Sequence, residues 1–492
     1  MDRPERMAPR SSEARSAARV ASSDVVAPLP LLRRPSTGFV AICLGYFAII
    51  LDGSVLNVAI PAIRTDLHGS LGGAQWVLNA YTLTLACLLL TFGALGDRIG
   101  LRRIFLVGAS VFTVASAACA TAPSILALTF ERVAQGLGAA ALLPATLALI
   151  RYLFEDRAGQ ARAAVVWVGI GAGAVALGPL VGGVLIDALG WRSIFLINVP
   201  IGIATVVLGS MAIVETPRRR RSVDWVGQAA AIVALGLVTA AIIHGGESGW
   251  GSPVTIVMLA VGLLVGVAFW TTERRIAQPM LPPGFFANRR RTVAVACASL
   301  MGFLFYGTLF MMSLYFQVVR GWSPASAGVA LLPLTVGTLV GPFLLYAPLA
   351  RRFGHPVLLV AGFVGTTVGV AVLSRTGSHT EYLLIGLGLV LIGLASTVAF
   401  SALTSLLLAT VSAHQSGLAS GVQNTMRQTG ALMAVSILGA VLNARAMSSQ
   451  LPIAFGVLAA AALVAVAVSS LSLAGGAGAE ITSAQRTSPH LH

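Results

Sequence analysis

The chain has 492 residues, of which 57% are apolar and 10% charged, and its formal net charge at pH 7 is +15. So much apolar surface cannot be hidden inside a water-soluble domain of this length, so the composition excludes a soluble globular protein and indicates that lipid covers much of the chain. The sequence contains no lysine. All 32 basic residues are therefore arginines, and their placement along the chain is more informative than the total, which alone does not indicate a nucleic-acid partner.

Apolar segments long enough to cross a bilayer follow one another along nearly the whole chain. A membrane-spanning helix needs about 20 mostly apolar residues. Fourteen segments satisfy this condition and predict fourteen transmembrane helices, at residues 39–60, 75–96, 104–122, 124–150, 162–186, 193–214, 225–243, 253–272, 292–318, 325–348, 356–374, 381–410, 415–444 and 452–474.

Arginine placement predicts the orientation of these helices. Cytoplasmic loops of membrane proteins carry an excess of positive charge, whereas translocated loops do not. If the amino terminus lies inside, most arginines fall on the cytoplasmic side, and the outside loops hold only Arg64, Arg192, Arg320, Arg375 and Arg445. We therefore expect a multi-pass protein of the inner (cytoplasmic) membrane with both termini in the cytoplasm.

The predicted helices fall into a six, two, six pattern with polar segments at the ends and in the middle. We interpret the arginine-rich start of the chain as a disordered cytoplasmic tail rather than a cleaved signal. The predicted units are a tail at 1–37, a six-helix bundle at 38–214, two additional helices at 215–272, a cytoplasmic linker at 273–291, a second six-helix bundle at 292–474 and a tail at 475–492.

A weak internal repeat supports this division. The loop after the second predicted helix, residues 93–103 (GALGDRIGLRR), has a fainter copy 254 residues later at 347–355 (APLARRFGH). Both copies follow the second helix of a six-helix half, which predicts two parallel repeats with a central site between them. Asp97 of the first copy is replaced by Arg351 in the second, so any gating role should belong to the first copy.

Several motifs resemble those of the fourteen-helix drug:proton antiporters, the multidrug exporters of the major facilitator superfamily. The resemblance covers nearly all of the chain after the tail. It implies an all-α membrane protein with the major facilitator fold, that is, two six-helix bundles plus two extra helices between them. The matching segments are 51–61 (LDGSVLNVAIP), 93–103, 132–138 (RVAQGLG), 173–183 (GAVALGPLVGG), 191–200 (WRSIFLINVP) and 423–430 (QNTMRQTG).

Three ionisable residues inside the predicted helices are candidates for proton coupling. A charged side chain within a bilayer is costly and is therefore expected to face water or a partner. Asp52 and Arg132 lie at the same predicted depth, so they could pair. A guanidinium favours the ionised carboxylate and a dry cavity favours the protonated one, so Asp52 could take up and release a proton between states. A purely structural ion pair is the alternative. Glu131 could be a second proton site or could pair with Arg132 or a neighbouring helix.

The loop motif and the fifth helix contain candidates for gating. Asp97, with Arg98, Arg102 and Arg103 beside it, could form a salt-bridged latch across the inner face, although a solvated loop would carry the same charges. Gly178 lets helix backbones approach closely and Pro179 can bend the helix, which suits alternating access but is also ordinary packing.

Candidate substrate-binding residues come from both halves: Asn57, Gln135, Tyr306, Phe310, Asn424 and Arg427. Tyr306 and Phe310 belong to an aromatic-rich ninth helix that could clasp flat apolar substrates, although aromatic side chains facing lipid are equally ordinary. Arg427 could contact an anionic substrate group, reach across the interface or bond to backbone carbonyls.

The function predicted from the sequence is proton-driven export of small amphipathic drugs or antibiotics by alternating access. No nucleotide-binding motif, metal-ligand spacing or catalytic constellation occurs, so we expect no enzyme activity, no metal and no cofactor beyond the proton motive force. The expected partners are a small-molecule substrate, protons and the lipid bilayer, without nucleic acid, and an adaptor protein is not predictable. The alternatives are a dedicated exporter of one endogenous metabolite (a self-made antibiotic, a siderophore or a lipid) and a transport-inactive membrane sensor.

Overall fold

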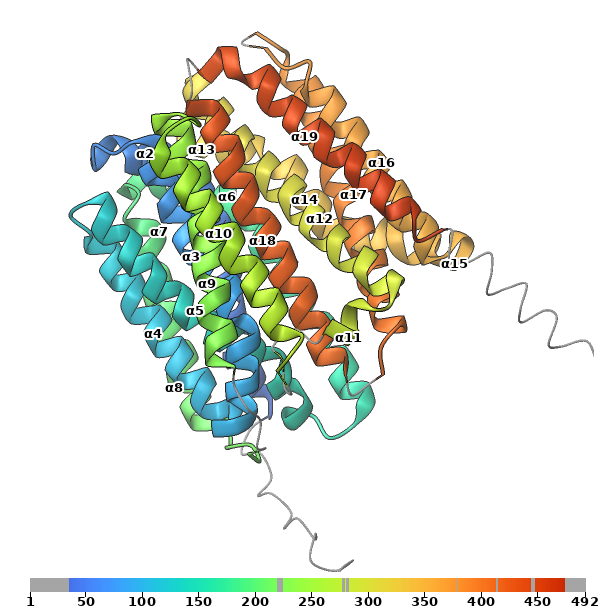
Figure 1. Cartoon of the computed structure of the whole chain (residues 1–492). Coiled ribbons are helices and arrows are strands. Elements are labelled where there is room, and N and C mark those ends of the chain that lie inside the picture. Colours follow the sequence, from blue (N-terminus) through green and yellow to red (C-terminus); the bar gives the residue numbers. More distant parts are fainter. Residues whose placement is uncertain are drawn as a thin grey trace, which may run out of the picture.

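The computed structural model describes residues 35–218, 224–276, 279, 283–377, 379–412, 415–443 and 447–473, and most of this part of the chain is helical. Within this part of the chain, fourteen helical stretches are long and apolar enough to cross a membrane, which confirms the predicted number. The helices pack side by side in one elongated body (Figure 1). The predicted tails, apart from residues 35–37, lie outside the described residues.

The amino-terminal bundle contains the first six membrane-spanning stretches. Its turns use polar side chains that cap the next helix, as where Ser70, Ser124 and Asp156 accept hydrogen bonds from backbone amides of the first turn. The helices are α2 (Pro35–Asp66), α3 (Leu71–Ile99), α4 (Leu101–Thr121), α5 (Ile125–Leu153), α6 (Arg157–Leu189), and the pair α7 (Ser193–Leu196) and α8 (Asn198–Ala212), which together form the sixth stretch.

The carboxy-terminal bundle contains the last six membrane-spanning stretches. Its helices are α12 (Arg289–Leu314) with the π-helical continuation η1 (Tyr315–Val319), α13 (Pro324–Ala330), α14 (Leu332–Gly341), the π-helical η2 (Pro342–Tyr346), α15 (Ala347–Phe353), α16 (His355–Leu373), α17 (Tyr382–Ala409), α18 (Ser416–Asn443) and α19 (Met447–Ser470).

Several predicted boundaries were wrong by a few residues, and one predicted helix is interrupted. The ninth stretch begins at Arg289 rather than 292 because the Asn288 side chain caps it, which removes three residues from the predicted linker. The first helix begins at Pro35, inside the predicted tail. The segment predicted as one helix at 325–348 is divided among α13, α14, η2 and α15. Its internal prolines lack the amide hydrogens that a continuous α-helix requires.

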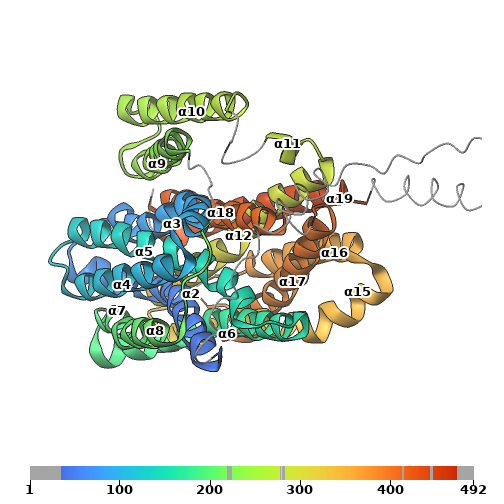
Figure 2. The same ribbon diagram turned by 90° about the horizontal axis from the view of Figure 1, so that it is seen from below.

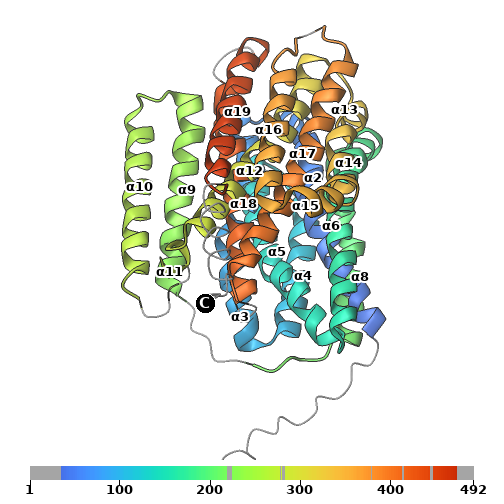
Figure 3. The same cartoon turned by 90° about the vertical axis from the view of Figure 1, so that its right-hand side faces the viewer.

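Two additional helices, α9 (Trp225–Ser248) and α10 (Pro253–Glu273), stand outside the two bundles (Figures 2 and 3). Helix α9 packs against α3 and α18, one helix from each bundle, whereas α10 packs mainly against α9. The Gln228 side chain of α9 is buried against Thr91 of α3, and near the other end Glu247 accepts a hydrogen bond from the Gly72 amide over 3.1 Å. The short α11 (Pro283–Phe286) precedes the second bundle.

The internal repeat has a structural counterpart at two glycines. Gly100 joins α3 to α4 with φ = 105°, and Gly354 joins α15 to α16 with φ = 75°. Both conformations lie in the region that favours glycine, so the backbone turns in the same way at equivalent points of the two halves. This agreement supports the division of the chain into two related bundles.

The two bundles are tied together near the α2–α3 connection. Ser313 donates to the Asn57 carbonyl over 2.8 Å, and Asn79 donates to the Ser436 hydroxyl over 2.9 Å. Nearby, the Ala325 amide donates to Asp187 over 3.0 Å. These contacts close the molecule at this end, and we call them the α2–α3 seam.

Candidate functional site

A buried ion pair joins α2 to α5 in the middle of the amino-terminal bundle. Arg132 Nη1 lies 2.5 Å from Asp52 Oδ2, and the two side chains are 1% and 2% exposed. Because neither charge reaches solvent in this state, each depends on the other for electrostatic stabilisation. The structure thus brings together the two residues that the sequence placed at one depth.

The second oxygen of Asp52 is held by neutral amides. Oδ1 accepts hydrogen bonds from Gln135 Nε2 over 2.9 Å and from Asn198 Nδ2 over 3.0 Å. Both amides also donate to Ser116 Oγ, over 3.1 and 3.2 Å, and Ser116 in turn donates to the Phe195 carbonyl. The carboxylate therefore lies where α2, α4, α5 and α8 meet, and we call these residues the Asp52 network.

Arg132 has neutral neighbours as well as Asp52. Its Nε donates to the Val77 carbonyl of α3 over 3.2 Å, and its Nη1 donates to Gln135 Oε1 over 2.6 Å. The guanidinium carbon lies 4.2 Å from the centre of the Tyr81 ring, an arrangement that stabilises a cation through the ring quadrupole. Arg132 can therefore remain charged when Asp52 is neutralised.

Two polar residues of the network were not among the candidates from the sequence. Ser116 lies in an otherwise apolar helix and has no sequence signal of its own. Asn198 does have one, because it belongs to the 191–200 motif. Its Oδ1 is buried and has no hydrogen-bond partner within the described residues. This oxygen is therefore an unused hydrogen-bond acceptor next to Asp52.

Among the described residues, no ion pair joins Glu131 to Arg132, which pairs with Asp52 instead. Its Oε2 atom is buried and has no hydrogen-bond partner among the described residues. The side chain is only partly buried overall.

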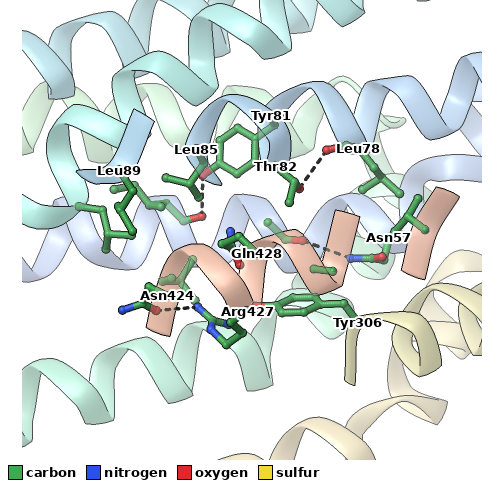
Figure 4. Close-up of a pocket in the computed structure, with 16 residues that line it drawn as sticks. Asn57, Leu78, Tyr81, Thr82, Leu85, Leu89, Tyr306, Asn424, Arg427 and Gln428 are labelled. Carbon is green, nitrogen blue, oxygen red and sulfur yellow. Dashed lines mark hydrogen bonds between the residues drawn. The ribbon is translucent and has the colours of Figure 1, made fainter. Parts of the chain in front are cut away.

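A separate, small cavity of about 50 Å³, partly open to solvent, lies between the two bundles. Of the predicted substrate-binding residues, Asn57, Tyr306, Asn424 and Arg427 line it (Figure 4). Its other lining residues are Ile49, Ile50, Gly53, Leu78, Tyr81, Thr82, Leu85, Leu89, Leu143, Gln428, Ala431 and Val435.

Two predicted substrate-binding residues do not line this cavity. Gln135 is completely buried in the Asp52 network, because it follows Arg132 by one helical turn and shares its face. Phe310 is also completely buried. It lies one turn beyond Tyr306, towards the seam where Ser313 already contacts α2, so the closed bundles cover it.

Arg427 holds its position in the cavity wall through neutral contacts. Nη1 donates to the Tyr306 hydroxyl over 2.9 Å and Nη2 donates to Asn424 Oδ1 over 3.3 Å. The guanidinium carbon lies 5.7 Å from the Tyr306 ring centre and 6.0 Å from that of Phe400. Figure 4 shows Asn424, Arg427 and Tyr306 in a row opposite Tyr81 and Leu85.

The cavity and the Asp52 network are neighbours that share structural elements. Gly53 and Asn57 line the cavity from α2, the helix that also carries Asp52. Tyr81 lines the cavity and lies against the Arg132 guanidinium. A change in the Asp52–Arg132 pair can therefore reach the cavity through α2 and Tyr81. The described residues contain no group of three or more His, Cys, Asp or Glu side chains suited to a metal ion.

The arginines of the loop motif contact the end of α8 within the same bundle. Arg103 Nε lies 3.5 Å from Glu215 Oε2, and Arg102 donates to the Ser210 carbonyl over 3.1 Å. The Leu101 amide donates to Thr216 Oγ1 over 2.9 Å. Asp97 and the exposed Arg98 lie in the last turn of α3. In this state Arg102 ties the loop to α8 and Arg103 ties it to the segment that follows α8, where Glu215 is a partner that sequence reasoning missed.

Gly178 and Pro179 lie at a close approach of α6 to its neighbours. A Cβ atom at Gly178 would overlap the Ser54 side chain of α2. On the other side of α6, a Cβ atom at Gly328 of α13 would lie 2.2 Å from the Pro179 carbonyl oxygen. Helix α6 continues through Pro179 without interruption. Pro179 therefore belongs to the contact between the bundles, whereas Gly178 packs against α2 within the amino-terminal bundle.

Known proteins resemble this chain in sequence and in fold. The family model described as "Major Facilitator Superfamily" matches residues 42–435. The Methylenomycin A resistance protein of Bacillus subtilis (strain 168) is 34% identical over 83% of this chain and 88% of its own length. The Tetracenomycin C resistance and export protein of Streptomyces glaucescens is 34% identical over 84% of this chain and 77% of its own. The solved structure of peptide transporter POT covers 89% of this chain and 96% of its own, with a TM-score of 0.63 and 14% identity, and shares the fold.

Proposed function

Because the chain belongs to the major facilitator superfamily, we propose that this multi-pass membrane protein is a proton-driven antiporter that exports small amphipathic drugs or antibiotics. The single observation that carries the proposal is the buried Asp52–Arg132 pair beside a cavity between the bundles. The two relatives described above, which are named for resistance and, in one case, export, support the direction of transport.

Asp52 is the proton carrier in this proposal. In the present state its carboxylate is paired with Arg132. When the bundles reopen and water reaches it, protonation neutralises Asp52 and weakens its attraction to Arg132. The new O–H group requires an acceptor, and the unpartnered Asn198 Oδ1 lies next to Asp52 and supplies one.

The proton and the substrate alternate rather than compete for one group, because Asp52 does not line the cavity. Protonation alters the packing of α2 against α5 and α8, and α2 also forms one wall of the cavity. Occupancy of either site therefore biases the same helix, which is what an antiporter requires for the two events to be coupled.

The orientation of the protein in the membrane determines which side of the transporter is closed in this conformation. We place the protein in the cytoplasmic membrane with both termini inside, following the arginine distribution, so that the α2–α3 seam lies on the outer side. The contacts at the seam then make the present conformation closed to the outside. The contact of Arg103 with Glu215 lies on the inner side.

The Asp52→Asn variant tests the proposal, and Asp66→Asn is its matched control. Asp66 is also an aspartate of α2, but it lies at the helix end with Arg192 and is outside the Asp52 network. A panel of antibiotics on a pump-deficient host first identifies compounds to which the wild-type protein confers resistance. These compounds are then added to everted vesicles in which respiration has built a proton gradient, and proton release is recorded by fluorescence.

We expect wild-type and Asp66→Asn vesicles to release protons on addition of a substrate, and vesicles with folded Asp52→Asn protein to release none at an equal protein amount. Substrate-dependent proton release by correctly folded Asp52→Asn protein would show that the ion pair is only structural. A sensor that has lost transport would give no release and no resistance with the wild-type protein either.

A further inference from the structure

The cavity between the bundles holds one ionisable group of fixed charge, Arg427, and its partners are neutral. Its hydrogen bonds go to the Tyr306 hydroxyl and the Asn424 side-chain oxygen. Its Nε is buried without a hydrogen-bond partner within the described residues. A guanidinium within the membrane normally has a carboxylate or water-filled surroundings to offset its cost, and the described residues supply Arg427 with neutral partners only.

The carboxy-terminal half of the sequence offers no carboxylate that could neutralise Arg427. After Glu273 the only acidic side chains in the whole sequence are Glu381 and Glu480. Glu381 precedes the first residue of α17, at the opposite end of that helix from Thr410, and Glu480 lies outside the described residues. The cavity wall therefore has a net positive charge when it is empty.

Asp52, whose neighbour in sequence lines the cavity, does not neutralise Arg427 either. Asp52 adjoins the lining residue Gly53, but its side chain is directed into the amino-terminal bundle, where it pairs with Arg132. That pair is neutral overall, so it does not offset the charge of Arg427.

Close helix packing fixes the position of Arg427. A Cβ atom at Gly302 of α12 would lie 1.9 Å from the Arg427 carbonyl oxygen, and one at Gly430 of α18 would lie 1.8 Å from the Ser299 carbonyl oxygen. The two backbones are thus in contact at Arg427 and one helical turn after it. A preorganised guanidinium of this kind loses little conformational freedom when it binds a planar oxyanion through two hydrogen bonds.

We propose that this cavity selects acidic substrates, in which a carboxylate or a comparable oxyanion binds Arg427 while a flat apolar body lies against Tyr306 and the facing wall of Tyr81 and Leu85. The inference rests on the proposed function, because it names the substrate class of the same cavity. Neutral analogues bind more weakly, since they lose the charged hydrogen bonds, and cations are disfavoured because the wall carries no acidic side chain.

The experiment compares three probes that share one ring system and differ in charge. They are 1-naphthoate, 1-naphthamide and 1-naphthylmethylammonium, and their binding to the full chain is measured by calorimetry. The protein is held in phosphatidylcholine nanodiscs, so that no anionic lipid competes for the guanidinium. We expect naphthoate to bind about 10-fold or more tightly than naphthamide, the range typical of charged hydrogen bonds, and the ammonium compound to bind least.

Variants of Arg427 assign the preference to this residue. In Arg427→Gln the affinity for naphthoate should fall to that for naphthamide, while the affinity for naphthamide stays as in the wild-type protein. Arg427→Lys keeps the charge and should retain part of the preference. Arg291→Gln is the matched control, because Arg291 binds the Thr410 carbonyl outside the cavity and its loss should leave all three affinities unchanged. Melting temperatures verify that each variant is folded.

Two results overturn the inference. One is a wild-type protein that binds the three probes equally, binds none of them, or prefers the ammonium compound. The other is a folded Arg427→Gln protein that keeps its preference for naphthoate. Proton-coupled currents in proteoliposomes test the proposed function separately. If the protein prefers the anionic probe but gives no such currents, antiport alone is refuted. If neutral or cationic substrates give currents that Arg427→Gln leaves unchanged, the acidic-substrate class alone is refuted.

Discussion

A methyl group added at Gly183 should destabilise the closed α2–α3 seam. A Cβ atom at this position of α6 would lie 2.3 Å from the Pro324 carbonyl oxygen and 2.8 Å from the Ala325 Cα atom, both on α13. These are backbone atoms, so neither can rotate away, and the two bundles must separate. Overpacking of this kind costs about 1–3 kcal/mol. Because the cost applies only where the bundles meet, Gly183→Ala should shift the population towards the open seam by about 5- to 150-fold.

Distances between spin labels measure this shift. Leu189 at the end of α6 and Leu383 at the start of α17 are 72% and 81% exposed and can carry labels as cysteines, once the four buried cysteines are replaced. Gly173→Ala is the matched control, because a Cβ atom there meets nothing within 4 Å. Both variants add one alanine to α6 and therefore gain the same helix propensity.

We expect a longer label distance in Gly183→Ala and the wild-type distribution in Gly173→Ala. Unchanged distances in a folded Gly183→Ala protein would refute the reasoning that backbone contact at the seam holds the present conformation. An equal lengthening in both variants would refute it as well, since the control lacks the contact.

Three further predictions concern the ion pair, the loop motif and the driving force. Asp52→Asn should lower thermal stability by about 3–5 kcal/mol because it leaves Arg132 without a counter-ion, and adding Arg132→Met should recover part of the loss in detergent melting curves. Gly100→Ala should cost about 1–2 kcal/mol, because φ is +105° and the new methyl meets Glu215, whereas Gly93→Ala, with space around it, should cost none. Exchange of one exported monoanion for one proton moves two charges, so an inside-negative potential of 100 mV should add about 4.6 kcal/mol of driving force, measurable with potassium diffusion potentials in proteoliposomes.

Hydrophobicity and arginine spacing were sufficient to predict the fourteen helices, because each membrane-spanning stretch satisfies its own length requirement. They could not predict the break within 325–348, where prolines inside an apolar run decide how the helix continues. The partnership of Asp52 and Arg132 was predictable because depth follows from position in a helix. The contacts of Ser116 and Asn198 within the Asp52 network were not predictable. They depend on how α4 and α8 are rotated about their axes relative to α2, and this rotation cannot be read from apolar sequences.

The same limitation explains why Gln135 and Phe310, two predicted substrate-binding residues, do not line the cavity in this state. Tyr306 and Phe310 are one helical turn apart and share a helix face, so sequence reasoning treats them alike. In the structure Tyr306 lines the cavity, whereas Phe310 is completely buried. Gln135 carries a side chain suited to substrate binding, yet it is used to hold the carboxylate. Tertiary packing decides which polar groups surround Asp52 and which line the cavity.

The separation of these two sets of polar groups limits how proton binding and substrate binding can be coupled. Asp52 and its amide partners lie inside one bundle, whereas Arg427 belongs to the other bundle and faces the cavity. If an acidic substrate met the proton site directly, protonation would leave Arg132 with an unbalanced positive charge and would strengthen substrate binding, which favours movement of both in the same direction. Placing the two groups on different bundles lets protonation act on helix packing through α2 and Tyr81 instead. Under the proposed function, antiport of an anion is therefore compatible with this architecture, because coupling through helix packing does not require the two groups to meet.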